Sequence, residues 1–196
     1  MRNLLSLTAL TALIAIGIAS AASAQVCMSN TCEAAVDGPK QGVHSQFDGS
    51  ADAILWPPNH KLRTVAISAQ NADGDECNVT INDVRQDEPV TGEGSGNTPV
   101  DAANCDNSCT SPDDDYDDAC VDVRGERSGV LKDGRYYHIL YTMDDPDCSA
   151  TPMPKMGDAR VLVPHDQGVA HAGLWVDQGP VYDSDGSTDM TISCTP

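Results

Sequence analysis

Short stretches in which apolar and polar residues alternate run through the middle of the chain. The alternation is clearest in residues 64–69, 77–82, 121–124, 135–143 and 159–163. A period of two residues places every second side chain on the same face, so each stretch predicts a β-strand with one buried face. No stretch of eleven residues shows a helical period. The pattern therefore predicts an all-β protein.

The connections between these stretches indicate how the strands are arranged. Residues 71–75 and 132–134 have the Asn, Asp and Gly content of turns. The alternation slips by one residue before Val84, which predicts a β-bulge. Six or seven short strands with uneven connections favour an antiparallel, immunoglobulin-like Greek-key sandwich with long acidic loops. A closed barrel is the alternative.

The flanking regions lack this alternation. Residues 25–50 show no clear period, and we interpret them as an N-terminal tail tied by cysteines. Residues 51–167 form the predicted sandwich, and residues 168–196 form a C-terminal extension. Within the sandwich, residues 86–119 are polar and contain the acidic run 113–118. Such a run must be solvated or bind cations.

The first 24 residues have the pattern of a signal peptide. Arg2 precedes a nearly continuous apolar run from Leu4 to Ile18, and Ala22-Ser23-Ala24 is a small-x-small cleavage site. A membrane anchor is the alternative, which the short apolar run disfavours. No other segment could span a bilayer, so we expect no membrane insertion after cleavage.

The net charge limits the classes of partner. The chain has 196 residues and a formal net charge of −19, and removal of the signal peptide with Arg2 leaves 172 residues with a charge of −20. A protein that binds phosphates needs a basic surface, so this charge argues against nucleic acid and anionic membranes. It favours solubility and divalent cations.

Eight cysteines follow the cleavage site. They are Cys27, Cys32, Cys77, Cys105, Cys109, Cys120, Cys148 and Cys194. An even number in an exported protein predicts up to four disulfides and a periplasmic or extracellular location. A structural zinc site is disfavoured because no C-x-x-C pair occurs.

A series of motifs resembles a known family. The motifs are Leu-Trp-Pro-Pro-Asn-His-Lys (55–61), Asp-Glu-Pro-Val (87–90), Gly-x-Gly-x-Gly-Asn-Thr (92–98), Arg-x-Glu-Arg-Ser-Gly (124–129), Gly-Arg-x-Tyr (134–137) and Val-Pro-His-Asp-Gln (163–167). In this order they are similar to immunoglobulin-like or hyalin-repeat-like modules of bacterial secreted and surface proteins. The resemblance implies a sandwich fold, and no established activity comes with it. The cysteines and acidic run before Arg124 depart from the family pattern.

One disulfide follows from an immunoglobulin-like arrangement. In such a sandwich the turns after the second and sixth strands lie at the same end. Cys77 ends the first of these turns and Cys148 lies in the other, so we expect them to pair. The pairing of the other six cysteines stays open.

The loop from residue 87 to residue 101 is the best candidate metal site. It supplies oxygen ligands of the kind that Ca²⁺ prefers, namely Asp87, Glu88, Asn97 and Asp101. The spacing does not match an EF-hand loop. Residues 183–189 are a second candidate. For both loops a solvated acidic surface is the alternative.

Catalytic motifs are scarce. The sequence has no Gly-x-Ser-x-Gly elbow and no His-Glu-x-x-His motif. The sequence therefore favours a secreted, disulfide-stabilised, non-catalytic binding or structural module, whose partner is an unidentified protein or a surface glycan. One alternative is a small secreted hydrolase, which would require His60 or His165 beside a carboxylate in a pocket. The other is a secreted inhibitor or toxin-like protein.

The predicted cleavage site can be tested by mass. Cleavage after Ala24 should leave Gln25 at the new N-terminus, free or cyclised to pyroglutamate. Intact-mass measurement of the exported protein checks this prediction. A retained Met1, or a lipid on Cys27, would contradict it.

Overall fold

The computed structural model describes residues 30–38, 51–91, 100–110, 117–130, 134–146, 153–165, 177–179 and 181–183. These residues contain no helix, so the predicted all-β class is confirmed. The predicted signal peptide lies outside the described residues, as do Asn97 and the cysteines at 27, 148 and 194. The described strands are β1 (Glu33–Asp37), β2 (Ala53–Ile54), β3 (Leu62–Gln70), β4 (Asn78–Gln86), β5 (Ala102–Thr110), β6 (Asp117–Arg124), β7 (Arg135–Asp144), β8 (Lys155–Val163) and β9 (Tyr182–Asp183).

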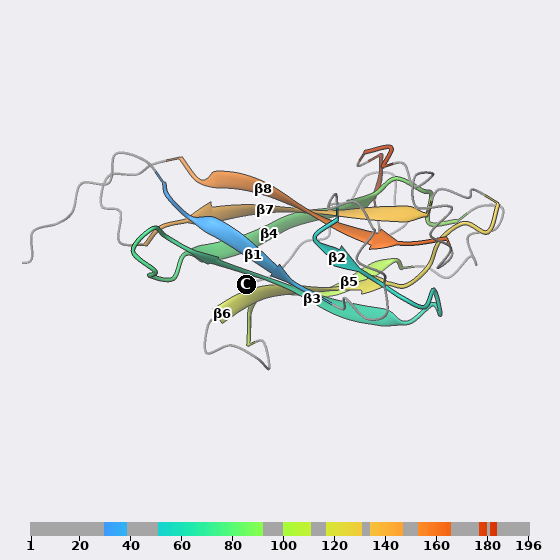
Figure 1. The fold of residues 1–196 in the computed structure, drawn as a ribbon, viewed down its shortest axis with the longest axis horizontal. Coiled ribbons are helices and arrows are strands. Elements are labelled where there is room, and N and C mark those ends of the chain that lie inside the picture. The colour runs from blue at the N-terminus through green and yellow to red at the C-terminus, as the bar shows by residue number, and fades with distance from the viewer. Residues whose placement is uncertain are drawn as a thin grey trace, which may run out of the picture.

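The strands form two sheets that face each other across one apolar core. The first sheet has the order β1-β3-β6-β5, and the second has the order β2-β8-β7-β4-β9. Every described pairing is antiparallel except β2 with β8, which is parallel. Figure 1 shows β7 and β8 in one layer and β3 and β6 in the other. The finer immunoglobulin-like Greek-key topology stays a prediction.

The alternating stretches form strands as their pattern predicts. Val65 and Ile67 on β3 are fully buried, as are Tyr137 and Ile139 on β7. These side chains meet the inward residues of β4, β6 and β8 in a single cluster. The predicted bulge is confirmed, because the pairing of β4 with β7 shifts register between Ile81 and Asp83.

Three strands lie where the sequence analysis did not place them. β1 falls within the predicted tail, yet it pairs with β3 along its whole length. β5 falls within the long polar stretch, and β9 lies in the predicted C-terminal extension, where it pairs with β4. Each is an edge strand of its sheet. An edge strand buries little, so its sequence carries a weak apolar alternation.

Two disulfides attach edge strands to the rest of the fold. Cys32 bonds to Cys77 with a Cα–Cα distance of 6.2 Å, and Cys109 bonds to Cys120 across β5 and β6. The predicted pairing of Cys77 with Cys148 is therefore wrong. The reason is β1, which the sequence pattern does not predict and whose pairing with β3 brings Cys32 beside the turn that ends at Cys77. Cys105 is also disulfide-bonded.

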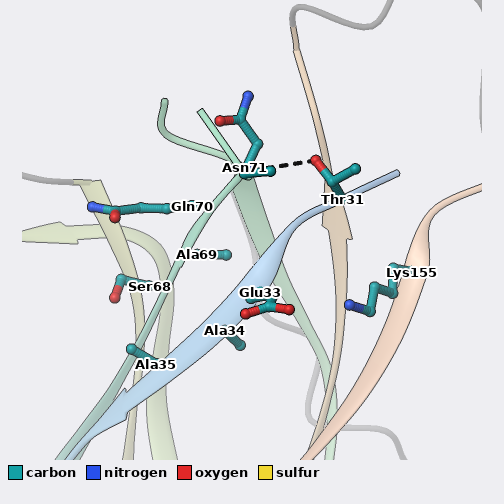
Figure 2. Close-up of a pocket in the computed structure, with 10 residues that line it drawn as sticks. Thr31, Glu33, Ala34, Ala35, Ser68, Ala69, Gln70, Asn71 and Lys155 are labelled. Carbon is teal, nitrogen blue, oxygen red and sulfur yellow. Dashed lines mark hydrogen bonds between the residues drawn. The ribbon is translucent and has the colours of Figure 1, made fainter. Parts of the chain in front are cut away.

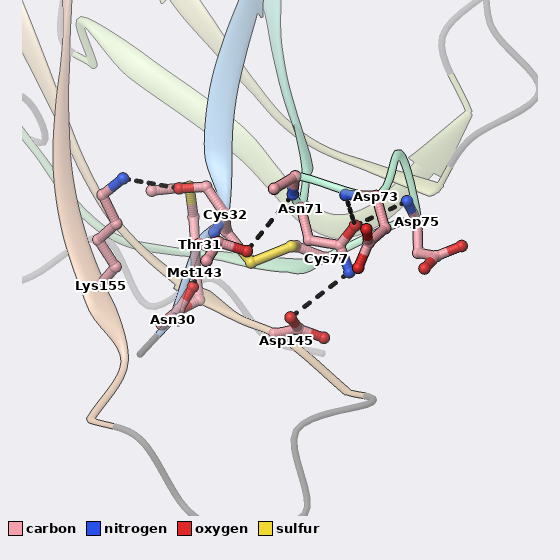
Figure 3. The surroundings of a disulfide bond; sticks show 11 residues. Asn30, Thr31, Cys32, Asn71, Asp73, Asp75, Cys77, Met143, Asp145 and Lys155 are labelled. Atoms are coloured by element: carbon pink, nitrogen blue, oxygen red, sulfur yellow. Dashed lines mark hydrogen bonds between the residues drawn. A yellow bond between two sulfur atoms is a disulfide. The ribbon is translucent and has the colours of Figure 1, made fainter. Parts of the chain in front are cut away.

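The turn before Cys77 has a stable local structure, which Figure 3 shows around the disulfide. The Asn71 side-chain oxygen accepts hydrogen bonds from the backbone N–H groups of Asp73 (3.0 Å) and Asp75 (2.9 Å). The Asn30 amide on the other side of the bridge donates to the carbonyl of Met143 (2.9 Å). The disulfide thus joins β1 to a turn that is already ordered by its own asparagine.

Candidate functional site

The motif segments that lie far apart in the sequence meet at one end of the two sheets. Their polar side chains come from the end of β4, the start of β5, the end of β6 and the start of β7. We call this group the buried polar network, and it comprises Gln86, Glu88, Asp101, Arg124, Glu126, Arg135 and Tyr137. All of these except Arg124 are at most 1% exposed.

Arg135 lies at the centre of the network. It is fully buried, and its side chain is held by two carboxylates. Its Nε lies 3.0 Å from Glu88 Oε2, and its Nη1 lies 2.5 Å from Asp101 Oδ2. The Gln86 amide donates to the same Asp101 oxygen (2.9 Å), and the guanidinium lies 6.0 Å from the centre of the Tyr137 ring. One cation therefore compensates two acids that burial would otherwise leave uncompensated.

Arg124 joins this centre to the surrounding loops. Its Nε and Nη2 donate to the carbonyl of Val100 (2.9 and 2.7 Å), and its Nη1 donates to the carbonyl of His60 (2.6 Å). Its Nε also lies 3.8 Å from Asp101 Oδ1. The Tyr137 hydroxyl donates to the Arg124 carbonyl (2.8 Å). The two arginines thus fix backbone segments as well as neutralising charge.

His60 forms a pair with a buried carboxylate. Its Nδ1 lies 3.0 Å from Oε2 of Glu126, which is fully buried, whereas 52% of the His60 side chain is exposed. His60 has a φ of 59°, which is uncommon for a residue other than glycine. Backbone bonds hold it there, because His60 N–H donates to the carbonyl of Gly125 and Gly125 N–H donates to that of Lys61. The outcome is a half-exposed imidazole that is oriented by a buried carboxylate.

Asp87 lies beside the network and has a perturbed acidity. Its Oδ1 accepts a hydrogen bond from Tyr136 N–H (2.8 Å). Burial raises the pKa of Asp87 to about 7, and the neighbouring charges of Glu88 and Asp177 add to this effect. Burial also raises the pKa of Asp101, although Arg135 opposes that shift. Asp87 therefore changes its charge near neutral pH.

The predicted calcium ligands have different surroundings in the structure. Glu88 and Asp101 do come together, but both contact Arg135. Asp87 turns towards the backbone of Tyr136, and Asn97 lies outside the described residues. The described residues contain no group of three or more His, Cys, Asp or Glu side chains arranged to hold a metal. Calcium binding by this loop stays a prediction.

The central role of Arg135 was not predicted from the sequence. A signal was present, because Arg135 shares its strand face with Tyr137 and Ile139, which the alternation places in the core. A charged residue on a buried face needs a compensating partner. The partners could not be assigned without the fold, since Glu88 and Asp101 precede Arg135 by 47 and 34 residues.

A groove lies beside β1 near the Cys32–Cys77 disulfide, at the other end of β3 from the buried polar network. It has a volume of about 790 Å³. Figure 2 shows Lys155 on the side of the groove opposite Ser68 and Gln70. Small side chains of β1 and β3 form much of its wall, and Lys155 donates to the carbonyl of Cys32 (2.7 Å). The groove thus combines small residues with one cation, one acid (Glu33) and several amide or hydroxyl groups.

Comparisons with known proteins add no family. No protein-family model matches the sequence, and no significant match is found among curated proteins or solved structures. Disulfides persist in oxidising compartments, so the bridges at Cys32–Cys77 and Cys109–Cys120 indicate an oxidising, secreted environment. The described residues contain no helix that is long and apolar enough to cross a membrane.

The importance of Arg135 can be measured by substitution. The Arg135→Met variant should lose about 3–5 kcal/mol in the free energy of unfolding, because Glu88 and Asp101 stay buried without their cation. Urea denaturation of the purified protein gives this value. Adding Glu88→Gln and Asp101→Asn to Arg135→Met should recover part of the loss.

The matched control is Arg63→Met on β3, which removes the same positive charge from an exposed position. Ion pairs of exposed side chains are worth ~0–1 kcal/mol, so this variant should change stability little. Equal losses in the Arg135 and Arg63 variants would contradict a central role for Arg135.

Proposed function

We propose that this protein is a secreted, disulfide-stabilised module with a non-catalytic binding or structural role. The observation that carries the proposal is the buried polar network. Its acids and bases compensate one another inside the protein, and they hold the loops between the strands. The motifs that resemble bacterial surface modules thus supply a structural framework. The two described disulfides are compatible with the same role.

The groove beside β1 is the surface that best suits a binding role. The groove is open to solvent, and the small side chains that line it leave room for another chain or a sugar. Glu33 and Lys155 also line it and can make polar contacts. It lies away from the buried polar network, so a partner could bind there without disturbing the framework. We therefore assign the partner, a cell-surface protein or a surface glycan, to this groove.

Binding to cells tests this proposal. Labelled mature protein should bind washed bacterial cells, and Ala35→Arg should abolish binding because the arginine fills the groove. Asp37→Arg on the same strand is the control, since Asp37 is exposed and does not line the groove. Protease treatment of the cells removes binding if the partner is a protein, and periodate removes it if the partner is a glycan. Absent binding, or binding that survives Ala35→Arg in a folded variant, contradicts the proposal.

A hydrolase is the second candidate, and the pairing of His60 with Glu126 favours it. A carboxylate that orients an imidazole is half of a common general-base arrangement. The described groove does not contain His60. We expect that no hydrolysis of ester, peptide or glycoside substrates will depend on His60, as measured with the mature protein and its His60→Gln variant. An activity that His60→Gln removes, with urea stability retained, would establish the hydrolase instead.

A further inference from the structure

A second cluster of charged residues lies on the outer face of the second sheet. His138 on β7 has neighbours, Tyr137 and Ile139, that face the core, so its own side chain lies on the opposite face. It is nevertheless only 3% exposed. Its Nδ1 lies 3.0 Å from Asp158 Oδ2, and its Nε2 lies 2.9 Å from Asp177 Oδ1. Carboxylates therefore contact both nitrogens of this imidazole.

This arrangement requires a particular protonation state. A neutral imidazole has one N–H donor, whereas an ionised carboxylate can only accept hydrogen bonds. Both contacts of His138 are satisfied together only when each ring nitrogen carries a hydrogen. The geometry thus matches the imidazolium ion, with one proton directed to Asp158 and one to Asp177.

Asp177 belongs to a segment that lies over the sheet near the buried polar network. We call residues 177–179 and 181–183 the C-terminal strap. Gln178 N–H donates to Asp87, and Val181 N–H donates to the carbonyl of Gln86 (3.1 Å). β9 at the end of the strap pairs with the last two residues of β4. The described strap is therefore held by His138, by Asp87 and by the edge of β4.

We propose that the C-terminal strap is a pH-sensitive closure, which the His138–Asp177 ion pair holds in place and which detaches when His138 becomes neutral. Detachment leaves Asp158 as the carboxylate that still contacts His138, and it frees the edge of β4 at Gln86. The sheet edge is then open to another strand, a form of recognition that uses backbone hydrogen bonds. The device is independent of the groove and of the proposed partner.

The charges that surround His138 come from three elements. Asp158 and Arg160 lie on β8, and Asp83 and Arg85 lie on β4, where Arg85 is the register partner of His138. Asp177 and the nearby Asp87 complete the set. Asp83 and Arg85 pair with each other, and Arg160 Nη1 lies 3.9 Å from Asp177 Oδ2. Arg160 thus keeps a weak attraction to the strap that does not vary near neutral pH.

The direction of the pH effect follows from His138. Burial lowers the pKa of His138, but the hydrogen bonds and charges of Asp158 and Asp177 outweigh burial and raise it above its ordinary value of 6.5. Its stabilising contribution is therefore complete below pH 6.5 and is lost as pH rises through the raised pKa. Asp87, with a pKa of about 7, also ionises in this range, but its repulsion of Asp177 is opposed by the hydrogen bond that it accepts from Gln178 N–H. The closure therefore weakens as pH rises because His138 loses its charge.

Amide hydrogen exchange followed by NMR tests the closure in the mature protein. If detachment changes the His138 pKa by one unit, the equilibrium between attached and detached strap changes about tenfold. The amides of Gln178 and Val181 donate from the strap to Asp87 and to Gln86, so we expect their protection factors to fall about tenfold or more between about pH 6 and about pH 9. The protection of amides in the centre of β7 and β8 should stay constant.

Two variants identify the group responsible. His138→Gln should lower strap protection at the acidic pH to the value of the alkaline form and remove its pH dependence. Asp177→Asn, which changes the strap and leaves the sheet sequences intact, should do the same. The control His60→Gln removes a histidine that pairs elsewhere and should leave the profile unchanged.

Three results would overturn the closure. One is strap protection that is equal at both pH values in the unmodified protein. Another is a pH dependence that persists in His138→Gln or Asp177→Asn. The third is a parallel loss of protection in β7 and β8, which would show that the whole domain loosens rather than the strap.

Discussion

The placement of one arginine between two buried carboxylates constrains one whole end of this protein. Arg135 starts the central strand β7, and its guanidinium must reach both Glu88 and Asp101 because each acid is buried. That requirement fixes where the chain leaves β4, where it enters β5 and how β7 begins. Arg124, Tyr137 and Gln86 then close the remaining hydrogen bonds. An apolar core of alternating strands would tolerate many loop paths, whereas a buried ion network tolerates few.

The sequence predicts the apolar strands well because the alternation that identifies each strand lies within the strand itself. β3, β4, β7 and β8 each bury one face, so a period of two residues is sufficient to find them. The slip before Val84 even located the bulge. β1 and β5 were missed for the opposite reason, since an edge strand of small or polar residues carries almost no periodic signal. The error in the pairing of Cys77 followed directly from the missing β1.

The acids of the candidate site were predictable from the sequence, but their chemistry was not. The acids at positions 87, 88 and 101 were recognised as a group with a common role, and the structure brings Glu88 and Asp101 together. The sequence suggested an external cation, whereas the described residues supply an internal one. Spacing along the chain cannot distinguish these cases, because two carboxylates can converge either on a guanidinium from a distant strand or on a bound metal ion.

The parallel pairing of β2 with β8 has a consequence for the order in which the protein folds. Ala53 and Ile54 are made early, but their partners Val161 and Leu162 are made near the end of the chain. The buried network likewise needs β4, β5, β6 and β7 before Arg135 can neutralise Glu88. Most contacts are accordingly between residues distant in sequence, a topology that folds slowly. Such a topology delays stable structure until the strands from both ends of the domain are present together.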